Sequence, residues 1–187
     1  NKECVKDGIV NKALIYGYNG VGKSNLALAI FDIVSHISDK RFAIEKYHNY
    51  LNANNPSDTA KFKFEFSFDK NTLVYEYTKK DVETLVSEKL IINNKEFASL
   101  DRSKSNVFTT SAIGAESLNK DLKNSPISII KYIDANSVLE ENEDNNTFKK
   151  FIDFVSHMLL FRNLDDRFYI GLEEGTHSLE EDIVKQG

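Results

Sequence analysis

The order of apolar and polar residues predicts a strand, a glycine turn and a helix near the start of the sequence. Residues 13–16 form an uninterrupted apolar run, which is typical of a short buried strand, and Gly17 ends it. Apolar residues then recur at helical spacing and predict a helix over about 23–38. These residues are Leu26, Ile30, Ile33, Val34 and Ile37.

From residue 61 the apolar residues recur at every second position, which predicts strands that each bury one face. The first strand alternates Phe62, Phe64, Phe66 and Phe68 with Lys61, Lys63, Glu65 and Ser67. We expect Phe64 and Phe66 to be buried and the two lysines to face solvent. A turn at "DKN" leads into a returning strand over 73–77, and two more candidates, 82–92 and 95–100, flank "NNK". The pattern predicts an antiparallel meander of about four strands.

The remaining segments predict loops and helices. Residues 43–60 lose periodicity, and residues 101–125 are rich in Ser, Asn and Thr, which indicates a linker or a mobile loop. Ser125-Pro126 is typical of a helix start, and the isoleucines at 127, 130 and 133 suit a short helix, with a strand as the alternative. "ENEDNN" is predicted to be an acidic loop. Asn146 or Thr147 could then cap a helix whose apolar face is Phe148, Phe151, Ile152, Val155 and Leu159.

Composition narrows the class of protein. The chain has 187 residues, of which 41% are hydrophobic, and its formal net charge of −5 does not indicate a globally basic nucleic-acid binder. Its single cysteine, Cys4, excludes an internal disulfide and a cysteine-rich zinc site, and its four histidines lack metal-ligand spacing. No apolar run is long enough to cross a membrane. These features favour a cytoplasmic protein with no membrane partner.

Residues 17–24, "GYNGVGKS", match the phosphate-loop pattern G-x-x-x-x-G-K-[ST] at every fixed position. The glycines let successive backbone N–H groups turn toward anionic oxygens, and the following helix adds positive charge at its N-terminus. Lys23 can reach the β- and γ-phosphates of a nucleotide, and the Ser24 hydroxyl can ligate Mg²⁺. The predicted cofactors are therefore ATP and Mg²⁺. The predicted binding residues are Asn19, Gly20, Val21, Gly22, Lys23, Ser24 and Asn25, with Ser24 also as the metal ligand.

The residues at the variable positions of this loop indicate which group of phosphate-loop proteins the chain resembles. "GYNGVGKSNL", with Asn19 and Asn25, resembles the SMC, RecF and OLD-like branch of the ABC-type ATPases, and the surrounding thirty or so residues look like the N-terminal part of bacterial AAA-type ATP-binding proteins near the OLD family. The resemblance implies a mixed α/β or α+β fold, in which a P-loop NTPase lobe of ABC-ATPase type is followed by an antiparallel meander and C-terminal helices. It also implies that residues 1–187 form one partial ATPase domain. Its expected parts are 1–45 (strand, P-loop and helix), 60–101 (β-subdomain) and 125–187 (mainly helical).

Several motifs of a complete ABC-type ATPase are missing from the sequence. The chain has one glutamine, Gln186, where a Q-loop is implausible, and it has no S-G-G signature. "FYIGLEE" over 168–174 ends in two glutamates but is broken by Gly171, so a surface turn is favoured over a Walker B strand. His177 is not expected to be a switch histidine. We therefore expect ATP binding with little hydrolysis, because the groups that orient the attacking water would come from elsewhere.

Three functional hypotheses follow. In the first, this chain is the N-terminal lobe of a cytoplasmic ATPase, whose partners are ATP, the C-terminal half of the same polypeptide and a second protomer in an ATP-driven homodimer. In the second, ATP switches a binding module for DNA or a protein effector in DNA repair or phage defence, and Lys61 and Lys63 could touch a phosphate backbone. The third, a small P-loop kinase or GTPase, is weak because the four arginines are scattered and no N-K-x-D motif occurs.

Overall fold

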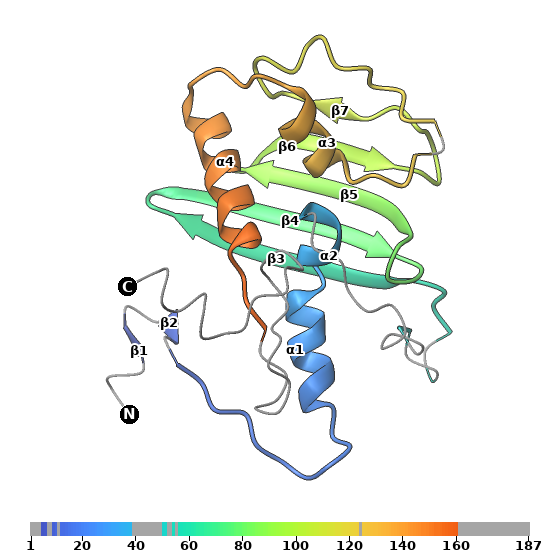
Figure 1. Ribbon diagram of the computed structural model, residues 1–187, viewed down its shortest axis with the longest axis vertical. Helices are drawn as coiled ribbons and strands as arrows, with labels where there is room; N and C mark the ends of the chain where they lie inside the picture. The colour runs from blue at the N-terminus through green and yellow to red at the C-terminus, as the bar shows by residue number, and fades with distance from the viewer. Residues whose placement is uncertain are drawn as a thin grey trace, which may run out of the picture.

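The computed structural model describes residues 5–6, 9–10, 12–38, 50–51, 54, 56–123 and 125–160. Its central element is a mixed α+β unit built on a five-stranded antiparallel sheet, in which neighbours in sequence are neighbours in space (Figure 1). The strands are β3 (Ala60–Phe68), β4 (Asn71–Lys79), β5 (Leu85–Ile92), β6 (Lys95–Asp101) and β7 (Thr109–Thr110). A separate antiparallel pair joins β1 (Val5–Lys6) to β2 (Ile9–Val10).

The meander confirms the strands predicted from the alternating pattern and adds β7. Strands β3 and β4 pair along their full length, from Ala60 opposite Lys79 to Phe68 opposite Asn71. The turn between β5 and β6 has φ values of 49° at Asn93 and 63° at Asn94, as a two-residue hairpin turn requires. The alternation of apolar and polar residues was sufficient to predict these strands, because each strand has one face on the core and one face toward solvent.

In the described part of the chain, four helices accompany the sheet: α1 (Lys23–Phe31), α2 (Val34–Ile37), α3 (Ile129–Asn136) and α4 (Glu143–Ser156). Helices α2, α3 and α4 lie against the sheet, whereas α1 extends away from it past the edge formed by β3 (Figure 1). The core between helices and sheet is strongly aromatic. Its fully buried members include Leu73, Tyr75, Leu90, Phe97, Phe108, Ile130, Phe148 and Phe151.

The single helix predicted over 23–38 is wrong, because the helix breaks at Asp32 and Ile33. The backbone N–H and the side-chain Oγ of Ser35 both donate hydrogen bonds to the carbonyl oxygen of Asp32, at 3.0 and 2.6 Å. These contacts tighten the turn and separate α1 from α2. The break also divides the apolar residues, since Ile33 is buried and Leu26 and Ile30 are 46% and 49% exposed.

Two further predictions need correction. Phe64 and Phe66 are half-buried rather than buried, because β3 is an edge strand whose one neighbouring strand among the described residues is β4. Residues 101–125 do not form a linker: Phe108 is fully buried, and a bridge pairs Val107 with Asp121. Buried apolar residues spaced through this polar segment, among them Phe108, anchor it to the core.

Helices α3 and α4 begin at residues other than those predicted. Helix α3 is capped by Ser128 rather than by Ser125. The Ser128 hydroxyl accepts hydrogen bonds from the backbone N–H groups of Ile130 and Lys131. Helix α4 is capped by Asn142, so that "ENEDNN" supplies its cap and first turn instead of an acidic loop. Acidic residues at this end stabilise the helix dipole. The two helices predicted after residue 125 are otherwise confirmed as α3 and α4, but Leu159, predicted on the apolar face of the second, lies beyond its end at Ser156 and is exposed. Residues 161–187, including 168–174 and His177, lie outside the described residues.

Candidate phosphate-binding loop

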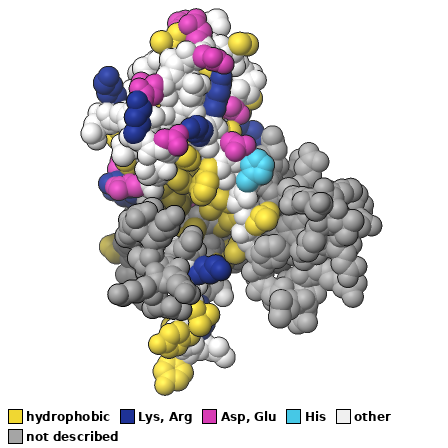
Figure 2. All heavy atoms as spheres, turned by 90° about the vertical axis from the view of Figure 1, so that its left-hand side faces the viewer, with side chains coloured by type: hydrophobic (Ala, Val, Ile, Leu, Met, Phe, Trp, Pro, Cys, Tyr) yellow, Lys and Arg dark blue, Asp and Glu magenta, His cyan; other side chains and the backbone are white. Residues whose placement is uncertain are grey.

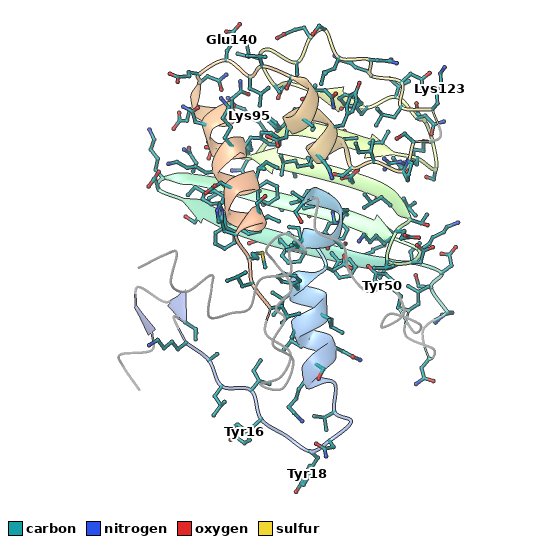
Figure 3. The ribbon with its side chains drawn as sticks, in the orientation of Figure 1. Tyr16, Tyr18, Tyr50, Lys95, Lys123 and Glu140 are labelled. Atoms are coloured by element: carbon teal, nitrogen blue, oxygen red, sulfur yellow. The ribbon has the colours of Figure 1, made fainter. Side chains whose placement is uncertain are left out.

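The segment before the loop is not a strand. Residues 13–16 have no strand partner among the described residues, and Leu14 and Tyr16 are 87% and 88% exposed. Figure 3 shows Tyr16 and Tyr18 at the lower end of the molecule, pointing away from the sheet and helices, and Figure 2 shows hydrophobic side chains in the same place. The strand predicted at 13–16 is wrong in this structure because a strand needs a neighbour for its N–H and C=O groups, and the described part of the chain offers none.

The loop itself turns as the glycine spacing predicts. Gly20 has φ 86° and Gly22 has φ 94°, a left-handed backbone that other residues adopt only at a cost. Gly22 is the N-cap of α1, and no side chain caps the helix. A Cβ added at either glycine would meet nothing within 4 Å. Backbone conformation, and not crowding, is therefore the reason for glycine at these two positions.

Lys23 closes the loop on itself. Its Nζ donates to the carbonyl oxygens of Gly17 and Tyr18, both at 2.8 Å. The first helical bond of α1 runs from the N–H of Leu26 to the carbonyl of Gly22, at 3.0 Å. The N–H groups of the three preceding residues therefore have no intrahelical acceptor. A flexible ammonium and several free donors meet at one helix N-terminus, which is the arrangement that attracts an anion.

All seven predicted binding residues lie in this loop and the first turn of α1. Asn19, Gly20 and Val21 are exposed, Gly22 and Lys23 are partly covered, and Ser24 and Asn25 are exposed. The structure describes no cluster of three or more His, Cys, Asp or Glu side chains that could hold a metal ion. Ser24, which the sequence predicts as the metal ligand, lies in the first turn of α1 with an exposed side chain.

The other end of α1 carries a buried polar cluster that the sequence analysis missed. Asp32 forms an ion pair with Lys79 of β4 at 3.1 Å, with side chains 3% and 0% exposed. Asp32 also accepts hydrogen bonds from Tyr77 at 2.8 Å and from Tyr50 at 3.0 Å. Burial lowers the pKa of Lys79, while the Asp32 carboxylate opposes that shift. The cluster fixes the C-terminal end of α1 to the sheet.

A second buried cluster adjoins the first and is centred on Glu88 of β5. One carboxylate oxygen of Glu88 accepts from Tyr75 at 2.8 Å and from Ser128 at 2.6 Å, and the other accepts from the N–H of Ile129 at 3.0 Å. Arg102 lies 3.4 Å from the same carboxylate. Because Ser128 caps α3, the cluster joins this helix to the sheet.

One signal in the sequence could have revealed the Asp32 cluster. Lys79 follows Leu73, Tyr75 and Tyr77 at the same period of two, so the alternation that buries those residues also buries the lysine. A charged residue in the apolar phase of a strand indicates a buried partner, because an isolated buried charge is costly. The partner itself could not have been identified, since Asp32 is far away in sequence.

Comparisons with protein-family models, with curated proteins and with solved structures found no match to the chain. In the described part of the chain every strand pair is antiparallel, and no helix is long and apolar enough to span a membrane. The antiparallel sheet by itself does not identify a nucleotide-binding lobe. The loop at residues 17–25 is therefore the feature of the described chain that points to a function.

Proposed function

We propose that residues 17–25 bind the phosphates of ATP with Mg²⁺, and that the chain is the nucleotide-binding lobe of an ATPase of the ABC type, similar to the SMC, RecF and OLD-like branch. One observation carries the proposal. The complete G-x-x-x-x-G-K-[ST] motif stands at an uncapped helix N-terminus, with Lys23 folded over the loop.

Each residue of the loop has a separate task in this proposal. The backbone N–H groups at the start of α1 hold phosphate oxygens, and Lys23 exchanges its contacts with the Gly17 and Tyr18 carbonyls for the β- and γ-phosphates. Ser24 presents its exposed hydroxyl to the metal. Bound Mg²⁺ would neutralise phosphate charge. No described residue near the loop is a carboxylate or glutamine that could orient water, so we expect negligible turnover.

The exposed apolar residues around the loop support the expectation of a second lobe. Leu14, Ile15, Tyr16, Val21, Leu26 and Ile30 are each between 46% and 88% exposed. A run that is apolar on both faces suits a strand covered on both sides. We propose that the C-terminal half of the same polypeptide covers residues 13–16 and supplies the missing catalytic groups, with ATP closing a homodimer.

A second candidate function is a nucleotide-switched module with little turnover, and the Asp32 cluster favours it. Nucleotide would bind at one end of α1, and Asp32 ties the other end to β4 through Lys79 and Tyr77. Any displacement of α1 on binding is thereby passed to the sheet. A DNA contact through Lys63 has less support, because this lysine is paired with Glu65 at 2.7 Å and lies 3.9 Å from Glu76.

Calorimetric titration of the chain with Mg-ATP tests the proposal. We expect Lys23→Ala to lower ATP affinity by about 10- to 100-fold, the effect of losing a charge-assisted contact to phosphate. Its thermal midpoint should stay near that of the wild type, since the described contacts of the Lys23 ammonium are to loop carbonyls at an exposed site.

Lys12→Ala is the matched control, because this lysine is exposed in the same segment but outside the motif. It should leave ATP affinity unchanged, and GTP should bind more weakly than ATP. A folded Lys23→Ala variant that keeps wild-type affinity would refute the assignment. A Mg²⁺-dependent hydrolysis rate that Lys23→Ala removes would show that this chain already holds the catalytic groups. DNA affinity that falls steeply with salt would favour the binding module.

A further inference from the structure

Asn19 and Gly20 form the exposed tip of the phosphate loop. Both residues lie in the turn that precedes α1, and both are exposed. Tyr18, the residue before them, is 89% exposed and lies at the lower end of the molecule, away from the sheet (Figure 3). Solvent therefore reaches the side chain of Asn19 and the backbone of Gly20.

An asparagine followed by glycine is the pair of residues that deamidates most readily. The backbone nitrogen of the glycine loses its proton to water and attacks the side-chain carbonyl carbon of the asparagine, so that a new C–N bond closes a succinimide ring. The side-chain nitrogen takes up a proton and leaves as ammonia. Water then opens the ring at either carbonyl, which gives aspartate or isoaspartate. Glycine favours the attack because it has no Cβ to crowd the nitrogen.

The sequence contains one Asn-Gly pair, at residues 19 and 20. The turn itself requires the glycine. Gly20 has φ 86°, which other residues adopt only at a cost, although a Cβ added there would meet nothing within 4 Å. The conformation that forms the loop thus places the least hindered backbone nitrogen directly after an exposed asparagine.

Neither reacting group is held by a hydrogen bond. Among the described residues, neither the side chain of Asn19 nor the backbone N–H of Gly20 has a hydrogen-bond partner. The nearby Lys23 ammonium contacts the carbonyl oxygens of Gly17 and Tyr18 instead, both at 2.8 Å. Closing the ring therefore breaks no hydrogen bond of these two groups in the described structure.

Asn25 provides an internal comparison in the first turn of α1. Its side chain is exposed as well, but the residue that follows it is Leu26. The N–H of Leu26 donates to the carbonyl of Gly22 at 3.0 Å, so the nitrogen that would attack is held in the helix. The Leu26 side chain also crowds that nitrogen. Exposure alone therefore does not make an asparagine of this loop reactive.

The product of deamidation carries a negative charge in the loop. Residue 19 directly follows Tyr18, whose carbonyl oxygen contacts the Lys23 ammonium. A carboxylate at this position would be attracted by Lys23 and by the N-terminus of α1, which are the groups assigned to phosphate above. It would also repel phosphate oxygens. Isoaspartate would in addition insert a methylene group into the backbone of the turn.

We propose that Asn19 is a site of spontaneous deamidation, and that the carboxylate formed there weakens ATP binding by the phosphate loop. The reaction depends on the geometry of Asn19 and Gly20 alone, whereas its effect on ATP rests on the proposed function. Bound Mg-ATP protects Asn19, because Gly20 is among the residues assigned to the nucleotide. A chain kept without nucleotide therefore loses its binding site with time.

Peptide mapping of the aged chain by mass spectrometry tests the reaction. Cleavage after lysine gives peptides 13–23 and 24–40, which each contain one asparagine and no glutamine. Peptide 13–23 should gain one mass unit and separate into aspartate and isoaspartate forms, faster at higher pH because the attacking nitrogen must lose its proton. Peptide 24–40, which contains Asn25, should remain unchanged while peptide 13–23 is half converted. Asn19→Gln should prevent the conversion, because glutamine would have to form a larger ring.

Calorimetric titration with Mg-ATP tests the consequence. Asn19→Asp should raise the dissociation constant about tenfold, the effect of one repelled charge at a partly exposed site. Ageing of the wild type should weaken binding in step with the conversion of peptide 13–23. The affinity of Asn19→Gln should be the same before and after ageing. Ageing of the wild type in saturating Mg-ATP should slow the conversion.

The outcomes separate the reaction from its effect. If peptides 13–23 and 24–40 stay equally unchanged, Asn19 is not a deamidation site and the proposal is wrong. If Asn19→Asp binds Mg-ATP as tightly as the wild type, or if Mg-ATP binds but does not slow the conversion, the proposed effect on the phosphate loop is wrong. If the fresh wild type does not bind Mg-ATP, the proposed function fails and the effect fails with it, while the mapping still decides whether Asn19 reacts.

Discussion

At the scale of single residues, the core of this protein is stabilised by buried ionic and hydrogen-bonding groups as well as by aromatic packing. His36 lies between the Asp32 and Glu88 clusters, at 3.0 Å from the hydroxyl of Tyr75 and with its ring against Tyr77. Because the Tyr75 hydroxyl donates to Glu88, His36 Nε2 must donate to Tyr75. The Nδ1 atom is buried and has no hydrogen-bond partner among the described residues. The neutral imidazole is therefore the form that fits.

This geometry predicts a pH dependence of stability. Burial, followed by the charges of Lys79 and Arg102, holds the pKa of His36 well below its ordinary value of 6.5, although the backbone of Asp32 partly opposes the shift. Below pH 6.5 the unfolded chain takes up a proton that the folded chain does not, so the free energy of unfolding falls as pH decreases. The slope from this residue is at most about 1.4 kcal/mol per pH unit.

Urea unfolding between pH 7 and pH 5 measures this slope. His36→Gln should flatten it, because glutamine does not titrate and can still donate to Tyr75. His157→Gln, at an exposed position on α4, is the matched control and should leave the slope as in the wild type. Equal slopes for His36→Gln and the wild type would show that His36 titrates freely in the folded protein.

At the scale of elements, the strands could be predicted from the sequence more closely than the helix ends. A period of two recurs over whole strands such as β3 and β4, and the pattern directly reports which face is buried. A helix end depends on a single capping contact. Asn142 caps α4 by accepting from the N–H of Asn145 at 2.9 Å, and several asparagines in "ENEDNN" had equal claims. The choice was made by tertiary contacts, since Asn145 itself is bound to the carbonyl of Ile113 at 2.9 Å.

The cap of α4 can be tested with two neighbouring asparagines. Asn142→Ala should reduce the free energy of unfolding by about 0.5–2 kcal/mol, because the side chain that accepts from the helix is lost. Asn146→Ala should be neutral or slightly stabilising, since Asn146 is exposed within the helix and alanine favours helix. Chemical denaturation of both variants compares them directly. A larger loss at Asn146 would return the cap to the position suggested by the sequence.

At the scale of the whole molecule, the turn of the phosphate loop follows from a local motif, whereas a sheet depends on pairing between separate segments of the chain. The turn at residues 17–25 could be predicted because its glycine spacing is local, and the structure has a left-handed backbone at Gly20 and Gly22 and a helix from Lys23. The strand at 13–16 could not be decided locally, because a strand exists only where another strand pairs with it. Its four apolar residues are consistent with burial in a larger sheet and with exposure in this chain.

Two leucine variants distinguish these two states of residues 13–16. Leu14→Ala should change the free energy of unfolding of this chain by less than about 0.5 kcal/mol, because the side chain is 87% exposed. Leu73→Ala removes the same atoms from a fully buried side chain in β4 and should cost about 2–5 kcal/mol. Thermal and urea unfolding of both variants provide the comparison. If Leu14→Ala costs as much as Leu73→Ala, residues 13–16 already belong to a packed sheet within this chain. If it costs nothing here but several kcal/mol in a longer polypeptide, the second lobe supplies the neighbouring strand, and the phosphate loop is completed only when the two lobes meet.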